Sequence, residues 1–502
     1  MSLTPNAPAS RRPRARLAVV CLALCIAFLF QGTRGLFETT EGRYAEVGRE
    51  MVAGGDWMVP HLDGHPHWTK PPLTYWSIAA GLVTAGRNTW GARLYDAFAL
   101  VVTTLVVGAL GAALWDELTG AIAALMFVTI PFVVMGANVV SPDMLLTCFE
   151  TLAILCFWRS ARAAQPAQQQ RMHASAQWMA GMWAAFGLAF LTKGPPGLLP
   201  LIAILVYAVV SRRRGFPMPR LFNLAGLVLF VVIGFAWYII SVVRDPSLLG
   251  YFLGQEVWGR VATGMHHRNA NWYMAIVVFG LPLLVGLGAW LVTGIMDARS
   301  AARPRGWRAM WRDASSNPEV LFLMLWLVAP LLIFSMSKSR LPLYVLPLVP
   351  AQALLLARLS VRVRGDASAL RRTWRIAIVS AVLLIALKVV AARVPSSQNM
   401  APLAKEIRAT HAGRVTVVDN GRLYGLQFYL DGALHRTTSA ELAGELTAAA
   451  SRLDADSTGC EVLLTGRAAP PLLARRCGNG SIQCSVTGDR DHELWVLRSK
   501  AR

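Results

Sequence analysis

The sequence predicts an α-helical polytopic membrane protein with a small α/β domain at its C-terminal end. Its 502 residues are 55% hydrophobic and only 15% charged, with a mean hydropathy of +0.45, whereas a soluble protein carries about 25% charged residues. Long apolar segments recur along the chain, and short basic clusters separate them. We therefore expect about 11–13 transmembrane helices in residues 1–394 and a separate α/β domain in residues 395–502.

The apolar segments are long enough to cross a membrane, since about 20 apolar residues in a helix span the hydrocarbon core. We expect spans near residues 17–33, 94–115, 119–136, 143–158, 176–192, 196–211, 221–241, 272–293, 318–335, 342–358 and 376–393. The stretch from Leu17 to Phe30 follows an arginine cluster, and no clear small-residue cleavage site comes after it. It is therefore expected to be an uncleaved first helix and not a signal peptide.

The basic clusters predict the topology, because Lys and Arg in short loops mark the cytoplasmic side. With the N-terminus inside, the strongly basic loops all fall on that side: 159–175, 212–220, 294–317 and 359–375. This distribution explains the net charge of +21 and argues against nucleic acid as a partner. The odd number of spans then places the region after about residue 395 outside. We expect a multi-pass inner (plasma) membrane protein with a periplasmic C-terminal domain.

The C-terminal region alternates short apolar runs with a helical pattern. The expected strands are Val415–Val418, Glu461–Leu464 and Leu494–Leu497, and the expected helix is Ser439–Arg452. Three of the seven cysteines lie in this region: Cys460, Cys477 and Cys484. An oxidising compartment permits one disulfide among them and leaves one thiol over.

The first outer loop, residues 34–93, is the longest outside segment before the C-terminal domain, and it is rich in charged side chains. Residues 43–51 have helical periodicity, with Tyr44, Val47 and Met51 on one face and charges opposite. This pattern predicts a short helix lying along the membrane surface. A plain interfacial anchor is the alternative explanation.

Other outside loops add acids and cations. They contain Asp143 after Ser-Pro, Lys193 before Gly-Pro-Pro, Arg260 and His266-His267 in 242–271, and Lys338-Ser339-Arg340. Outside cations run against the topology rule, and the phosphate of a membrane-embedded lipid would explain them, because Arg and Lys bind phosphate. A carboxylate at the same depth would serve as a base for an incoming hydroxyl or amine. Each of these residues alone is more often a solvated loop charge or a contact to an anionic headgroup, and no cluster implies a metal or another cofactor.

The outer loop resembles a known family. Glu41-Gly42-Arg43-Tyr44-Ala45-Glu46, Gly55-Asp56-Trp57 and Trp68-Thr69-Lys70-Pro71-Pro72-Leu73 resemble the first outer loop of GT-C glycosyltransferases. The most similar group contains the lipid A aminoarabinose transferases, which are akin to protein O-mannosyltransferases. Asp143 after Ser-Pro, the Lys193-Gly-Pro turn and the Lys338-to-Pro347 segment also fit. The resemblance covers the organisation of residues 17–360.

The resemblance implies a polyprenyl-phosphate-linked sugar as donor, a lipid A, glycan or protein acceptor, and an inverting displacement. It also implies interfacial helices between the first two spans. The implied catalytic carboxylates are Glu41 and Asp143; the implied phosphate-binding residues are Arg43, Lys70, Lys338, Arg340 and Arg260; and the implied substrate- or lipid-binding residues are Tyr44, Tyr75, Trp76 and Tyr344.

The chain departs from the family pattern at two positions. Thr40 stands where the family has its favoured catalytic Asp, and Thr69 stands where it has a Glu before Lys-Pro. Threonine is no base at neutral pH. Either Glu41, Glu38 or Asp143 takes that role, or the acceptor chemistry differs, or the chain is inactive; we favour Glu41 with Asp143 in support.

Two other function classes compete with the transferase. A transporter or flippase of lipid-linked sugar places ionisable residues at mid-membrane, whereas the spans expected here are nearly free of central charges. A membrane scaffold without catalysis accounts for the C-terminal domain but leaves the Lys-Pro-Pro loop and the outside cations unexplained. A ligase or polymerase of O-antigen would carry its large arginine-rich outer loop late in the chain. The sequence names neither sugar nor acceptor.

Overall fold

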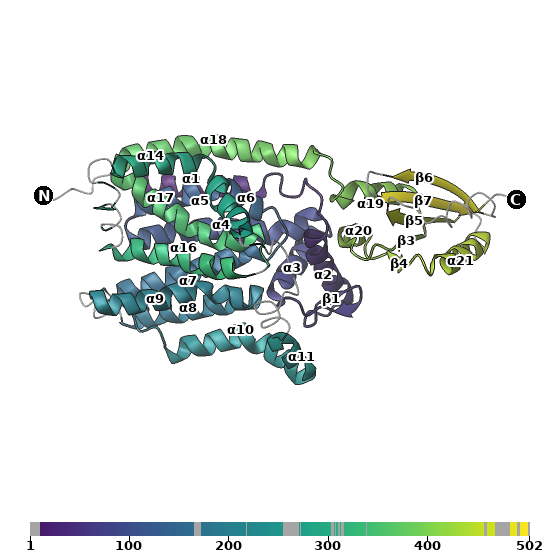
Figure 1. Ribbon diagram of the computed structural model, residues 1–502, viewed down its shortest axis with the longest axis horizontal. Coiled ribbons are helices and arrows are strands. Elements are labelled where there is room, and N and C mark those ends of the chain that lie inside the picture. Colours follow the sequence, from purple (N-terminus) through teal and green to yellow (C-terminus); the bar gives the residue numbers. More distant parts are fainter. Residues whose placement is uncertain are drawn as a thin grey trace. The chain divides into compact units, whose positions relative to one another are not determined.

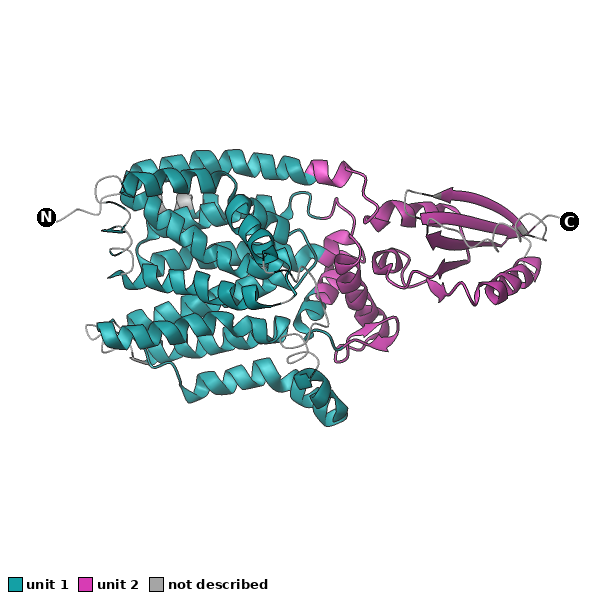
Figure 2. Ribbon diagram, viewed as in Figure 1, with its two compact units in different colours: residues 1–31, 68–77, 93–388 teal, residues 32–67, 78–92, 389–502 magenta. Residues whose placement is uncertain are grey.

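The structure is a computed structural model, and it describes residues 11–164, 172–216, 218–254, 271, 273–302, 306, 308–309, 312, 316–337, 339–455, 459–466, 482–488 and 492–499. The chain divides into two compact units (Figure 2). Unit 1 comprises Met1–Gln31, Trp68–Ser77 and Arg93–Lys388, and unit 2 comprises Gly32–His67, Ile78–Ala92 and Val389–Arg502. Residues 34–67 of the first outer loop therefore group with the C-terminal domain.

Unit 1 is helical (Figure 1). Its long helices are α1 (Arg11–Phe28), α4 (Thr89–Leu114), α5 (Glu117–Val128), α7 (Asp143–Ala163), α8 (Met172–Lys193), α9 (Leu199–Arg214), α10 (Leu224–Arg244), α14 (Ala289–Ala302), α16 (Pro318–Met336), α17 (Val349–Arg364) and α18 (Asp366–Arg393). Among the described residues, 7 helices are long and apolar enough to cross a membrane, or up to 8 if one bent pair counts as a single span. Three shorter apolar helices accompany them, at Arg16–Phe28, Leu73–Ala85 and Glu117–Val128.

Fewer described helices meet this criterion than the 11 spans that the sequence windows predicted. Two of the missing spans are broken. The span expected at 119–136 consists of α5 and a short helix, α6 (Pro131–Gly136), since Pro131 cannot continue the helix before it. The span expected at 272–293 is a pair of helical segments bent by 82°. Gly288 supplies the bend with a φ of 60°, and a Cβ there would lie 2.8 Å from Pro131 Cγ.

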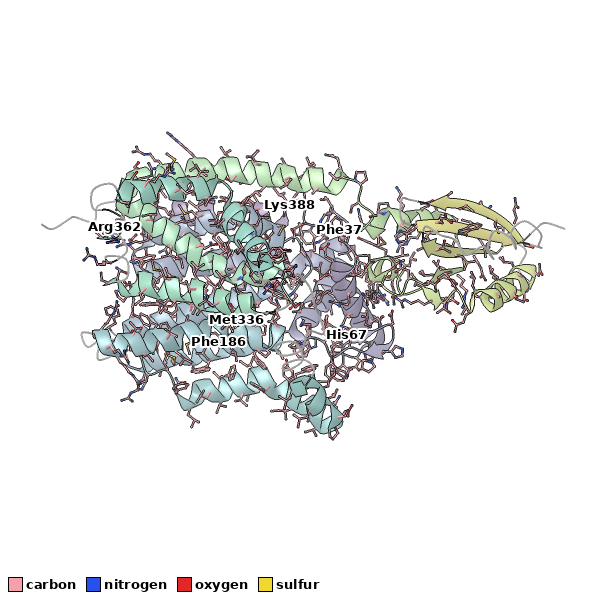
Figure 3. The ribbon with its side chains drawn as sticks, in the orientation of Figure 1. Phe37, His67, Phe186, Met336, Arg362 and Lys388 are labelled. Atoms are coloured by element: carbon pink, nitrogen blue, oxygen red, sulfur yellow. The ribbon has the colours of Figure 1, made fainter. Side chains whose placement is uncertain are left out.

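A lysine side chain caps the C-terminal end of α1 within unit 1. Lys388 lies on α18 (Figure 3), and its ammonium donates to the carbonyl oxygens of Ile26 (2.7 Å) and Leu29 (3.3 Å) and to Gln31 Oε1 (3.0 Å). The last carbonyls of a helix have no partner inside the helix, so the lysine satisfies groups that the membrane would leave bare. This charge inside an expected span therefore has a structural part at the end of α1.

Unit 2 contains a sheet with the strand order β4-β3-β5-β7-β6. Its strands are β3 (Arg414–Val418), β4 (His435–Thr437), β5 (Cys460–Gly466), β6 (Ile482–Gly488) and β7 (His492–Ser499). Strand β3 pairs in parallel with β4 and β5, and β7 pairs antiparallel with β5 and β6. The three expected strands and the expected helix, observed as α21 (Leu442–Ala455), are confirmed. The sequence did not predict β4 and β6.

The sheet of unit 2 has an apolar cluster on each face. Val415 and Leu494 pack with α19 (Met400–Ala409) and α20 (Tyr424–Tyr429), whereas Leu463 and Trp495 pack with α21. Neighbouring strand residues point to opposite faces, which explains the two clusters. Cys484 is disulfide-bonded and Cys460 is a buried free thiol, in agreement with one disulfide in this domain.

The amphipathic segment of the outer loop forms α2 (Thr40–Gly54). Tyr44, Val47 and Met51 are buried, as the periodicity predicted. Glu46 and Arg49, two of the charged residues expected opposite this face, are buried as well, with Arg49 Nη2 2.7 Å from Glu46 Oε1. These charged residues are buried because α2 packs against α20 and the first strand of a hairpin within unit 2. The predicted fold class, a helical multi-span protein with a C-terminal α/β domain, is confirmed.

Candidate active site

An ion pair joins the ends of two neighbouring helices in unit 1. Asp143 begins α7, and Lys193 is the last residue of α8, which packs beside α7. The Lys193 ammonium donates to Asp143 Oδ1, and the two side chains are only 8% and 7% exposed. Asp143 Oδ2 accepts no hydrogen bond from a residue that the structure describes. Lys193 thus occupies one oxygen of the Asp143 carboxylate, and the other oxygen is available to a ligand.

Tyr344 completes this group. It lies in a 3-10 helix, η6 (Pro342–Leu348), that packs against α7. The Lys193 Nζ atom is 4.4 Å from the centre of the Tyr344 ring, so the ammonium has a carboxylate and an aromatic face as neighbours. The structure therefore brings together Asp143 and Tyr344, two residues that the sequence singled out from segments about two hundred positions apart.

Lys193 is the functional candidate that the sequence analysis left without a role. Its position before Gly194 and Pro195, at the end of an apolar span on the expected outer side, was the available signal. The assignment failed because a lysine at a span end is ordinarily a headgroup contact. Only the structure shows that its ammonium turns inward to Asp143.

The Lys-Pro-Pro segment belongs to unit 1 at the same end of α8. Thr74 Oγ1, in the first turn of α3 (Leu73–Ala85), donates to the Thr192 carbonyl oxygen at 3.4 Å. Tyr75 is fully buried, whereas Trp76 and Lys70 are partly exposed. This contact holds the segment that carries three predicted site residues beside the carbonyl that immediately precedes Lys193.

Arg340 is buried and uses its guanidinium on the main chain. Its Nη1 donates to the Asn271 carbonyl and its Nη2 to the Ser335 carbonyl, both at 2.8 Å. These bonds give it a structural part in addition to the predicted contact with phosphate. Lys338 and Arg260, the other two cations expected late in the chain, lie outside the described residues.

Glu41, the favoured catalytic carboxylate, is engaged within unit 2. Arg34 Nη1 and Nη2 donate to its two oxygens at 2.7 and 2.9 Å, and the Phe37 amide donates at 3.0 Å. The Glu41 side chain is 4% exposed. These bonds fasten the residues that precede α2 to the first turn of the helix, so Glu41 anchors this part of the loop.

Arg43 and Tyr44 follow on the same helix. Tyr44 is buried, and the Arg43 guanidinium carbon is 5.7 Å from the centre of its ring. Arg43 is half-buried and forms no ion pair with a described residue. A partly desolvated guanidinium without a carboxylate partner is suited to bind an anion such as phosphate.

Glu38, a further candidate base, is bound by backbone amides. Its Oε1 accepts from the amides of Gly425 and Leu426 at the start of α20, the latter at 3.3 Å, and its Oε2 has no partner among the described atoms. Burial raises the pKa of Glu38 to about 7, although the amides and the Arg436 charge oppose the shift. Burial likewise raises the pKa of Glu46 to about 7, against the bond from Arg49.

Known proteins share parts of this sequence. The family of dolichyl-phosphate-mannose-protein mannosyltransferases matches residues 14–252. An undecaprenyl phosphate-alpha-4-amino-4-deoxy-L-arabinose arabinosyl transferase of Erwinia tasmaniensis is 30% identical over 338 residues, which are 67% of this chain and 57% of the relative. The enzyme of the same name from Pseudomonas savastanoi pv. phaseolicola is 31% identical over 343 residues, 68% of this chain and 60% of the relative. The chain thus matches somewhat more than half the length of these relatives.

Solved structures share the fold over nearly the whole chain. ArnT from Cupriavidus metallidurans bound to undecaprenyl phosphate superposes with a TM-score of 0.73 at 22% identity, covering 98% of both chains. The apo state of the same protein gives a TM-score of 0.71, with 96% of this chain and 97% of the other covered. With the family match and the related transferases, this agreement bears out the resemblance seen in the outer loop. The chain is a protein of the GT-C glycosyltransferase fold.

Proposed function

We propose that the chain is an inner-membrane glycosyltransferase that moves a sugar from a polyprenyl-phosphate donor to a lipid A, glycan or protein acceptor on the outer side of the membrane. The observation that carries the proposal is the buried group of Asp143, Lys193 and Tyr344, in a chain whose curated relatives are named transferases acting with undecaprenyl phosphate. In this proposal the N-terminus is cytoplasmic, the C-terminal domain is periplasmic, and no metal or other cofactor takes part.

The proposed reaction is an inverting displacement at the anomeric carbon. An acceptor oxygen or nitrogen forms a bond to that carbon, and the bond from carbon to the phosphate oxygen breaks, so that the polyprenyl phosphate leaves with the electron pair. Arg43 and Lys70 would neutralise the leaving phosphate through charge-assisted hydrogen bonds, with Arg340, Arg260 and Lys338 as further candidates. Tyr44, Tyr75 and Trp76 would line the path of the lipid.

A carboxylate takes the proton that the acceptor loses. We assign this role to Asp143 in preference to Glu41. One oxygen of Asp143 is not bonded by any described residue, whereas Arg34 and the Phe37 amide occupy both oxygens of Glu41. Lys193 then orients the Asp143 carboxylate through its hydrogen bond to Oδ1.

The test compares membranes from cells that produce wild type, Asp143→Asn, Glu41→Gln or the exposed control Asp366→Asn at matched protein levels. The readouts are release of free polyprenyl phosphate and mass spectrometry of lipid A, envelope glycans and envelope proteins. We expect a wild-type mass shift that the control keeps and Asp143→Asn abolishes; the shift would identify sugar and acceptor together. The absence of any product that depends on the wild-type protein would overturn the proposal in favour of a flippase or a scaffold.

A further inference from the structure

A two-residue turn in the outer loop lies between the ends of two short strands. Strands β1 (His61–Leu62) and β2 (His65–Pro66) pair antiparallel, and Asp63 and Gly64 connect them with φ values of 58° and 73°. Asp-Gly is a favoured pair for a hairpin turn with positive φ at both positions. Along the chain, this hairpin leads directly into the Trp68–Lys70 segment.

Helix α2 holds this turn from one side. The Glu50 carboxylate accepts the amide of Asp63 at 2.8 Å and the amide of Gly64 at 3.0 Å. Glu50 lies two helical turns after Arg43 on the same helix. The turn and the candidate phosphate-binding arginine are therefore parts of one hydrogen-bonded framework.

The C-terminal domain holds the same turn from the other side. Arg436, on β4, donates through Nη1 to the Asp63 carboxylate and through Nη2 to Gln427 Oε1 at 2.6 Å. The Arg436 and Asp63 side chains are 25% and 26% exposed. A second arginine bond thus fixes the guanidinium, which distinguishes this pair from an ion pair between two mobile surface side chains.

The start of α2 is fastened to the C-terminal domain as well. Besides the bonds of Glu38 to α20, the Glu38 amide donates to the Gln398 carbonyl at 2.9 Å, and the Leu36 amide donates to Tyr429 Oη at 2.8 Å. A Cβ at Gly42 would lie 2.7 Å from Gly425 Cα. Only glycine at position 42 therefore allows α2 and α20 to approach this closely. Both ends of the α2–hairpin segment are therefore held by the C-terminal domain.

We infer that Arg436 is a positioning residue for binding of the lipid phosphate: through Asp63 it holds the hairpin and α2 in the arrangement that presents Arg43 to the phosphate. The inference rests on the proposed function. Arg436 itself touches no reacting atom. In this view the C-terminal domain belongs to the donor-binding machinery, because fixed placement of cationic groups lowers the entropic cost of binding.

The test measures the dissociation constant of undecaprenyl phosphate for the purified full-length protein in detergent. The variants are Arg436→Ala, Asp63→Asn, their combination, and the charge swap Arg436→Asp with Asp63→Arg. The control is Arg422→Ala, an exposed arginine of the same domain whose side chain forms no ion pair with a described residue. Hydrogen exchange of peptides covering residues 56–66 provides a second readout.

We expect each single variant to weaken binding about fivefold to tenfold and to speed exchange in residues 56–66, while the control matches wild type. The double variant should bind undecaprenyl phosphate no more weakly than the weaker single variant, because both substitutions disrupt the same interaction. The charge swap should recover part of the affinity. Unchanged affinity in Arg436→Ala despite faster exchange would show a purely structural contact and overturn the inference. Sugar transfer is assayed separately, so intact lipid binding without any transfer would overturn the proposed function alone.

Discussion

The ammonium of Lys193 and the carboxylate of Asp143 meet at the ends of α8 and α7, each almost fully removed from solvent. A buried ion pair of this kind is sensitive to the loss of one partner, because the remaining charge stays buried without compensation. The two side chains therefore serve the structure of unit 1 as well as the proposed chemistry, and the two contributions can be separated.

Replacing Lys193 with methionine should destabilise the protein by about 3–5 kcal/mol, because Asp143 would keep a buried, uncompensated charge. The measurement is thermal unfolding of the purified full-length protein in detergent. The double variant Lys193→Met/Asp143→Asn should regain most of the stability but none of the transfer activity. Equal stability of the single and double variants would contradict the coupling of the two residues.

Replacing Arg34 with alanine should resemble Glu41→Gln in its structural effect, since alanine removes both hydrogen bonds to Glu41 and glutamine removes the negative charge and one of the two acceptor oxygens. We expect each variant to lower the unfolding temperature, and the double variant to lower it no further than the worse single variant. Transfer activity is measured alongside. If Arg34→Ala keeps full activity while Glu41→Gln has none, Glu41 is a catalytic carboxylate and our preference for Asp143 is wrong.

Arg43→Ala should weaken binding of the lipid phosphate without lowering the stability of the protein. Arg43 forms no ion pair with a described residue, so its removal leaves no carboxylate uncompensated. We expect an unchanged unfolding temperature together with about tenfold weaker binding of undecaprenyl phosphate, the loss of one charge-assisted contact. A large drop in unfolding temperature with unchanged affinity would assign Arg43 to packing against Tyr44.

Glu38 should make the stability of unit 2 depend on pH. Its pKa is about 7 in the folded protein against an ordinary value of 4.5, so the folded state binds the proton more tightly than the unfolded state. The contribution of Glu38 to the free energy of unfolding is therefore greatest below about pH 4.5, falls as the pH rises toward 7, and is constant above that.

The variant Glu38→Gln should flatten this dependence and raise the unfolding temperature at pH 8 relative to wild type. Unfolding is followed between pH 5 and pH 8 by hydrogen exchange of peptides from unit 2. Part of the slope should remain, because the pKa of Glu46 is also raised to about 7. An unaltered slope in Glu38→Gln would show that Glu38 is charged in the folded protein throughout this range.

The sequence predicted the fold where local patterns determine it. Apolar segments bounded by arginines marked the helices of unit 1, and alternating apolar runs marked β3, β5 and β7. It missed β4, whose three residues His435–Thr437 are polar or charged and gain their strand only by pairing with β3. It counted unbroken spans where Pro131 and Gly288 interrupt the helix, because a hydropathy window does not register backbone geometry.

For the site, the sequence supplied the side chains but not their pairing. Asp143 and Lys193 both stood out at span ends, yet 50 residues separate them, and no periodicity links positions so far apart. The sequence did not predict the burial of Glu46 and Arg49, because α20, which packs against their helix, lies nearly four hundred residues later. The sequence did not predict a role for Arg34. Its partner Glu41 was interpreted as a catalytic group, so no structural partner was expected for it.

Lys388 has a consequence for the order in which the chain can mature. The lysine and the Ile26 carbonyl that it binds are 362 positions apart, so a ribosome must complete almost all of unit 1 before the two can meet. Until then the end of α1 has open carbonyl groups that hydrocarbon cannot satisfy. We therefore expect the end of α1 to gain its final hydrogen bonds only after α18 is made, and truncation before residue 388 should leave a nascent chain that quality-control proteases recognise.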